Sequence, residues 1–291
     1  KLKSAYDISL GLVGSEMCIR DSLGDAGRAA GPRGANSKPL LYDYPTFDGL
    51  DDERRHRKER LTAAFRIFGR FGFSEGVAGH ITARDPEHTD CFWVNPFGMP
   101  FSHIRVSDLL LVGHTGEIIE GHHAVNQAAF AIHSGIHMTL PDVVAAAHSH
   151  SLHGKAFSSL GRLLDPITQD SCIFYNNHVL FDDYTGVVLD QEEGKRIAYA
   201  LGEARAAILR NHGLLTTGSS IPDAFLAMYI LQTSCQIQIR ALSGDRPLRP
   251  IPAGIVDTIR QQADQVTKGL GGKLAWPGLW SPCLLYTSPS P

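Results

Sequence analysis

The sequence contains few cysteines, no long apolar run and no excess of basic residues. Its five cysteines among 291 residues form no Cys-x-x-Cys pair, so neither a disulfide framework nor a cysteine-based zinc site is indicated. No apolar run approaches the roughly 20 residues that span a bilayer. A formal net charge of -3 argues against a nucleic-acid or anionic-membrane binder, which would carry a basic excess. We therefore expect a reduced, cytoplasmic protein with no membrane or nucleic-acid partner.

The two ends of the sequence differ in character from the middle. The stretches GLVGSEMCIRDS (residues 11–22) and SPCLLYTSPSP (residues 281–291) are similar to translated sequencing adapters, and a native disordered tail is the alternative. We therefore leave residues 1–22 and 281–291 out of the fold prediction. Residues 23–50 indicate a mobile arm rich in Gly, Pro and Ala, residues 51–245 one domain, and residues 246–280 a polar C-terminal extension.

The middle of the chain alternates between strand-like and helix-like segments. Helices are predicted from Asp51, over residues 126–138, at EEGKRIAYALGE and over residues 221–242. Strands are predicted at HITARD, CFWVNP, DLLLVG and GEIIEG, over residues 143–147, within RAAILRNHGLLTTG, and at SCIFY and GVVLD around a loop that contains His178. Because strands and helices interleave, we expect a single α/β domain.

The stretch VVAAAHSHSLHG places His148, His150 and His153 directly after an apolar strand. Residues two apart in a strand point to the same face, so His148 and His150 can converge if the strand continues through them. Zinc usually takes three protein ligands, and His212 in LRNHGLL lies where another apolar strand meets a glycine turn. A hydrogen-bonded turn histidine is the alternative for His212, and a His-x-His pair alone is not specific.

The order of these motifs resembles the class II aldolase/adducin family. HSHSLHG and NHGLLTTG are preceded by GHITARDP, NPFGMPFSHIRVSDL and AIHSGIHMTLPDV and separated by EEGKRIAYALG, over roughly residues 51–240. The resemblance implies a three-layer α/β/α sandwich with a largely antiparallel central sheet. It also implies a divalent metal ion held by His148, His150 and His212, and a homo-oligomer, commonly a tetramer. Zinc is the expected metal, with manganese or iron as alternatives. His153 is expected to cap or pack in the following helix.

The sequence departs from the family at the positions that carry its sugar-phosphate chemistry. In the family's sugar-phosphate aldolases, a glutamate on the preceding helix serves as metal ligand and acid/base, and the matching residue here is Ala129. The residues that would hold the substrate phosphate are replaced by His80, by Phe97-Gly98 and by Gln127-Ala128. A phosphorylated sugar is therefore not the expected substrate.

These departures predict a metal-dependent lyase, either an aldolase or a decarboxylase, that acts on a non-phosphorylated small carbonyl or carboxylate compound. The proton donor that replaces the missing glutamate has to be another group or water, and His133, His178 and His80 are the candidate catalytic residues. Two alternatives stay open: a non-haem iron oxygenase with the same fold, and a non-catalytic adducin-like binding module.

Overall fold

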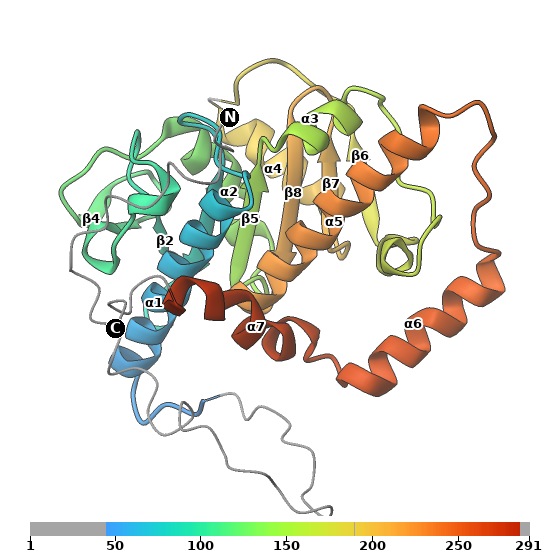
Figure 1. Cartoon of the computed structure of the whole chain (residues 1–291). Helices are drawn as coiled ribbons and strands as arrows, with labels where there is room; N and C mark the ends of the chain where they lie inside the picture. The colour runs from blue at the N-terminus through green and yellow to red at the C-terminus, as the bar shows by residue number, and fades with distance from the viewer. Residues whose placement is uncertain (1–44, 189, 286–291) are drawn as a thin grey trace, which may run out of the picture.

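The computed structural model describes residues 45–188 and 190–285 (Figure 1). The predicted artefact or tail at residues 1–22, the predicted arm up to residue 44, and residues 286–291 lie outside the described residues. No described helix combines the length and the hydropathy that a membrane crossing requires.

The described chain is built on one eight-stranded sheet with the strand order β4-β3-β2-β1-β5-β8-β7-β6. Neighbouring strands pair antiparallel throughout except for β6 and β7, which are parallel. This mixed, largely antiparallel sheet confirms the predicted fold class. The strands are β1 (His80–Arg84), β2 (Phe92–Val94), β3 (Leu110–Val112), β4 (Ile118–Glu120), β5 (Ala145–Ser149), β6 (His178–Phe181), β7 (Ala206–Leu209) and β8 (Gly213–Gly218).

Helices cover both faces of this sheet. The α-helices are α1 (Leu50–Arg70), α2 (Gln127–Thr139), α3 (Leu152–Ser158), α4 (Gln191–Leu201), α5 (Ile221–Leu242), α6 (Ala253–Thr267) and α7 (Gly271–Leu285). In Figure 1, α1 (blue), α5 (orange) and α7 (red) lie on the viewer's side of the sheet. Residues at the ends of the helices explain where several of them begin: the side chains of Asn126, Asp190 and Ser220 accept hydrogen bonds from the first backbone N–H groups of α2, α4 and α5.

The alternation of side chains along β5 divides the core into two layers. Ala145 and Ala147 pack in the cluster that contains α1 and α5, whereas Ala146 packs in the cluster that contains α2 and α4. All three alanines are completely buried. Their small side chains suit this central strand, because helices pack closely on both of its faces. The face of β5 that carries Ala146 is the face on which His148 lies.

The structure corrects four of the secondary-structure predictions. SCIFY is not a strand: residues Asp170–Phe174 form a short 3-10 helix. The described residues of GVVLD form a bend rather than a strand. His178 is not in a loop but begins β6, and the extension at 246–280 is not an irregular tail, because it forms α6 and most of α7. In the extension, the side chains of Trp276 and Trp280 are buried, because α7 packs onto α1 and α5.

Candidate metal centre

His148 and His150 lie at the carboxyl end of β5. The strand extends two residues beyond the predicted segment 143–147, and His148 pairs across the sheet with His80 of β1 and Leu215 of β8. His150 follows the last residue of the strand and lies half-buried at the start of the loop to α3. The strand therefore carries both imidazoles to one edge of the sheet, as the i, i+2 spacing predicts.

His212 reaches the same edge from the turn between β7 and β8. Asn211 has a φ of 56°, in the left-handed region that asparagine tolerates better than most residues, and the backbone N–H of His212 donates to the carbonyl of Leu209. A side chain at Gly213 would place its Cβ 2.5 Å from the carbonyl oxygen of Ser149. The local backbone thus favours Asn211 and requires Gly213, because β8 passes directly against β5 at this point.

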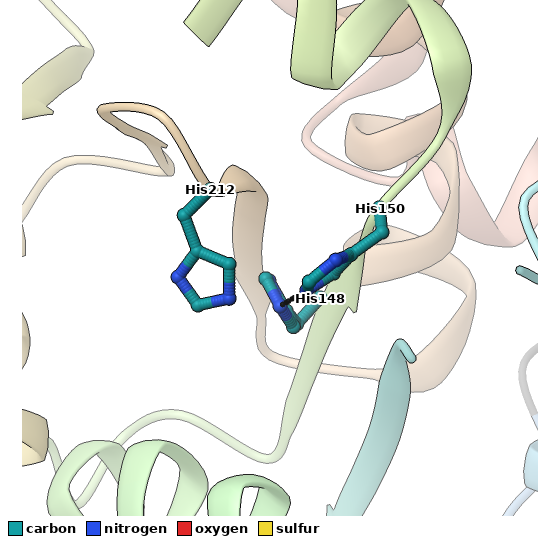
Figure 2. Close-up of side chains that lie close together, drawn as sticks. All are labelled: His148, His150 and His212. Carbon is teal, nitrogen blue, oxygen red and sulfur yellow. Dashed lines mark hydrogen bonds between the residues drawn. The ribbon is translucent and has the colours of Figure 1, made fainter. Parts of the chain in front are cut away.

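The three imidazole rings converge on one another (Figure 2). Their centroids are 4.8 Å apart for His148–His150, 4.8 Å for His148–His212 and 4.7 Å for His150–His212, and every pair of rings is steeply inclined. One ring nitrogen from each residue lies within 4.8 Å of the other two, and Nε2 of His148 lies 2.9 Å from Nε2 of His150. Two nitrogen ligands of a tetrahedral zinc ion lie about 3.3 Å apart, given zinc–nitrogen bonds of about 2.0–2.1 Å, so the donor set fits a metal ion.

The protonation state of the three histidines also fits a metal ion. Burial lowers the pKa of His148 well below its usual range, and the neighbouring imidazoles lower it further. Burial likewise lowers the pKa of His150, and that of His212 to about 4. All three rings are therefore neutral near pH 7 and each keeps a lone pair for a metal ion.

Two of the three candidate catalytic histidines lie beside this centre. The ring of His80, on β1, is 5.7 Å from the ring of His148, and the ring of His133, on α2, is 5.8 Å from that of His80. Both side chains are buried, and Nδ1 of His80 and Nε2 of His133 have no hydrogen-bond partner among the described residues. The burial of His133 also lowers its pKa, to about 3.

His178, the third candidate, lies elsewhere. It pairs with Ala206 at the beginning of β7, whereas His212 follows Leu209 at the end of that strand. Both of its ring nitrogens contact the backbone: Nε2 accepts from the N–H of Leu164, and Nδ1 lies 2.6 Å from the carbonyl oxygen of Phe174. These contacts give His178 a structural role between two loops, away from the three histidines.

Ala129 and His153 occupy the positions that the sequence predicts. Ala129 is completely buried in α2, and no carboxylate belongs to the group of potential metal ligands among the described residues. His153 lies in α3, where its Nδ1 is 3.2 Å from the side-chain nitrogen of Gln232, and it is not part of the ligand group.

Two buried polar residues next to His133 are not among the residues predicted from the sequence. Thr82 of β1 and His137 of α2 are buried. The hydroxyl group of Thr82 forms a hydrogen bond with His137 and another with His133. The signals were present, because His80 and Thr82 alternate along one strand face and His133 and His137 are four residues apart on one helix face.

Comparisons with known proteins agree with this geometry. The family model of the Class II Aldolase and Adducin N-terminal domain matches residues 59–239. The Decarboxylase NovR of Streptomyces niveus is 44% identical over 213 residues, which are 72% of this chain and 78% of that protein. The 4-hydroxy-3-prenylphenylpyruvate oxygenase/4-hydroxy-3-prenylbenzoate synthase of Streptomyces roseochromogenus subsp. oscitans is 44% identical over 220 residues, which are 75% of this chain and 79% of that protein.

A solved structure shares the fold at similar identity. The L-fuculose 1-phosphate aldolase from Glaciozyma antarctica PI12 is 45% identical to the chain and superposes with a TM-score of 0.69. The match covers 75% of this chain and 86% of that chain. Relatives of comparable identity therefore carry names that refer to three different reactions.

Proposed function

Because the chain belongs to the class II aldolase and adducin family, we propose that it is a metal-dependent lyase that removes the carboxyl group of a small, non-phosphorylated oxo acid. One observation carries this proposal. Three neutral imidazoles converge at the end of β5 with no carboxylate among the described potential ligands. Ala129, which the family resemblance matches to the acid/base glutamate of the aldolases, is buried.

In this proposal His148, His150 and His212 hold the metal ion, with zinc first and manganese or iron as alternatives, since imidazole suits all three. The bound ion would polarise a carbonyl oxygen and stabilise the negative charge that develops there. The protein's own contribution is orientation: the carbonyl of Leu214 fixes the ring of His148, and the left-handed turn at Asn211 fixes His212.

The neutrality of the ligands favours an anionic substrate. Imidazoles that keep their lone pairs add no charge, so a divalent ion among them retains its full charge in a half-buried site. An oxo acid offers two oxygen atoms and one negative charge to such a site. A phosphorylated sugar is disfavoured as the substrate. The positions that the family resemblance matches to the phosphate-binding residues hold His80, Phe97 and Ala128, which offer an imidazole, a phenyl ring and a methyl group.

The absence of a carboxylate favours decarboxylation over aldol cleavage. Aldol cleavage requires a base to remove the proton of the substrate hydroxyl group, and Ala129 cannot do so. In the decarboxylation of a 3-oxo acid, the electron pair of the broken carbon–carbon bond passes to the adjacent carbonyl, carbon dioxide leaves, and the carbon then takes up one proton. Only a proton donor is needed, and His80 and His133 lie beside the site.

A second candidate function is an iron-dependent oxygenase that decarboxylates a 2-oxo acid with dioxygen as the oxidant. It is supported by the 44% identity to a protein named as a phenylpyruvate oxygenase. The same three imidazoles are compatible with iron, because a three-histidine centre leaves coordination positions open for a substrate and for dioxygen.

Metal substitution under controlled oxygen tests these proposals. Metal-free protein is loaded with zinc or iron(II), supplied with 3-oxo acids or aryl 2-oxo acids, and assayed for carbon dioxide with and without oxygen, with His212→Ala as the control. Carbon dioxide release from a 3-oxo acid without oxygen supports the lyase. Release that requires both iron and oxygen overturns the lyase in favour of the oxygenase. If no metal is retained and no carbon dioxide is released, both proposals fail and a non-catalytic binding module remains.

A further inference from the structure

A polar stripe crosses the otherwise apolar interface between the sheet and α2. On β1, His80, Thr82 and Arg84 alternate with residues of the opposite core and face α2. On α2, His133 and His137 are one turn apart and meet this face. The neighbouring contacts of α2 with the sheet are apolar, through Ile132, Ile136, Ala146 and Leu215. Buried imidazoles are costly in such a layer unless they are hydrogen-bonded.

Three members of the stripe form a continuous hydrogen-bonded chain. The hydroxyl oxygen of Thr82 lies 2.7 Å from Nδ1 of His133 and 2.8 Å from Nε2 of His137. Thr82 and His133 are 0% exposed and His137 is 4% exposed. The chain therefore begins beside His80 at the metal centre and ends at His137, whose Nδ1 is buried and has no hydrogen-bond partner among the described residues. Arg84 holds this end by donating to the carbonyl oxygen of His137 over 2.6 Å.

The hydrogen inventory of this chain allows two arrangements. A hydroxyl group donates one hydrogen bond and can accept another, and a neutral imidazole has one N–H and one bare nitrogen. Both histidines are neutral, because burial lowers their pKa values to about 3. Either His137 donates to Thr82 and Thr82 to His133, which leaves an N–H at Nε2 of His133, or the two hydrogen bonds run in the opposite direction and leave that Nε2 bare.

Interconversion of the two arrangements moves a proton along the chain. We propose that His133, Thr82 and His137 form a reversible proton relay that delivers a proton beside the three converging histidines, in place of the missing carboxylate. The proposal rests on the proposed decarboxylation, which requires one proton at carbon.

The relay keeps every group neutral before and after the transfer. Nε2 of His133 gives its proton to the substrate carbon, and Nδ1 of His133 takes the hydroxyl proton of Thr82. The hydroxyl oxygen takes the Nε2 proton of His137, and Nδ1 of His137, which is buried without a partner among the described residues, takes a proton from a water molecule that enters beside it and becomes hydroxide. After the product leaves, water beside His133 returns a proton to its Nε2, the same shift runs backwards, and Nδ1 of His137 gives its proton back to the hydroxide. The net proton comes from water.

The hydrogen-bonded chain can be tested without a substrate. In the zinc-loaded full chain labelled with 15N-histidine, nuclear magnetic resonance reports which ring nitrogens carry a proton. The relay requires that, of the two nitrogens facing Thr82, one is protonated and the other bare at any instant. Two bare or two protonated nitrogens would overturn it. Thr82→Val should change the tautomer balance of both rings and Thr82→Ser should preserve it, whereas Thr216→Val, which removes a buried hydroxyl bonded to the carbonyl of Ala224, should leave it unchanged.

Kinetics with a decarboxylated substrate test the proton transfer itself. Thr82→Val is expected to lower kcat about 100-fold at unchanged zinc content, to change the solvent deuterium isotope effect and to be partly rescued by added imidazole, while Thr82→Ser keeps most of the activity. A Thr82→Val variant with wild-type kcat and isotope effect would contradict the proposed relay even if decarboxylation is established. Absence of turnover in the wild type would count against the proposed function alone, because the tautomer experiment still decides on the relay.

Discussion

Nδ1 of His148 lies 2.9 Å from the carbonyl oxygen of Leu214 on the neighbouring strand β8. This hydrogen bond places the ring N–H of His148 at Nδ1 and leaves the lone pair at Nε2, on the side of His150. Backbone carbonyls commonly orient metal-binding histidines in this way. The pairing of two strands thus sets the tautomer of the residue at the middle of the proposed centre.

Replacement of the three converging histidines should remove the metal ion. We expect His148→Ala, His150→Ala and His212→Ala each to reduce stoichiometric zinc in the purified protein to a small fraction, because an incomplete set of two imidazoles binds weakly. Elemental analysis of each variant measures this. His153→Ala is the matched control, since His153 is in the same sequence cluster but bonded to Gln232. Full zinc retention in any of the three ligand variants would contradict the assignment.

A methyl group at Gly213 should disturb the proposed metal centre without replacing any of the three histidines. Its Cβ would lie 2.5 Å from the carbonyl oxygen of Ser149 and 3.5 Å from Cε1 of His148, so β5 and β8 would have to separate. We expect Gly213→Ala to lose about 1–3 kcal/mol of unfolding free energy and to bind zinc more weakly, by denaturant titration and competition with a chelator. Gly49→Ala, which meets no atom within 4 Å, should change neither quantity appreciably.

The convergence of the three histidines could be predicted in part from local rules, and the family resemblance supplied the rest. A strand period of two brings His148 and His150 to one face, and the turn chemistry of Asn-His-Gly places His212 at a strand end. That the two strands are neighbours in the sheet came from the family resemblance, since pairing between distant segments leaves no local trace in one sequence.

Other features depended on tertiary contacts and were not predictable in this way. The segment SCIFY has strand-like composition, yet it forms a 3-10 helix in which Cys172 and Phe174 are buried under α5 and α6. The sequence does not reveal that His178 begins a strand. The parallel pairing of β6 with β7 depends on residues almost 30 positions away in sequence. The hydrogen bonds between Thr82 and two histidines of α2 likewise follow only once helix and sheet are packed. The predicted homo-oligomer stays a prediction.

The contact between α2 and α4 should be intolerant of a larger side chain. A Cβ at Gly194 would lie 1.9 Å from the carbonyl oxygen of Ala131, which is backbone and cannot turn aside. We expect Gly194→Ala to destabilise the fold by about 3 kcal/mol and to lower the thermal midpoint. Gly254→Ala in α6, which meets nothing within 4 Å, should be neutral or stabilising by up to about 1 kcal/mol. Equal thermal midpoints for the two variants would refute the close approach of the helices.

The buried histidines of α2 should make the fold sensitive to mild acid. Burial lowers the pKa of His133 and of His137 to about 3, and the charge of Arg84 contributes at His137. In the unfolded chain both groups titrate near pH 6.5. As the pH falls below about 6.5, the two histidines bind protons in the unfolded state but not in the folded state. The unfolding free energy therefore decreases progressively until the pH approaches about 3.

The size of this effect can be measured on metal-free protein, in which zinc release does not contribute. Between pH 7.5 and pH 5.0 each of the two histidines should lower the unfolding free energy by about 2 kcal/mol, given about 1.4 kcal/mol per pH unit and proton. His137→Phe removes one titrating group and keeps an aromatic ring against Phe92, whose ring stacks on His137 at 5.1 Å. Urea unfolding at the two pH values should therefore show a smaller loss of unfolding free energy in this variant than in the wild type, by about 2 kcal/mol.

The control is His122→Gln, at an exposed histidine, which should leave the loss unchanged. An identical pH dependence in His137→Phe and the wild type would mean that His137 takes up its proton in the folded protein over the same pH range as in the unfolded chain, which would contradict its lowered pKa.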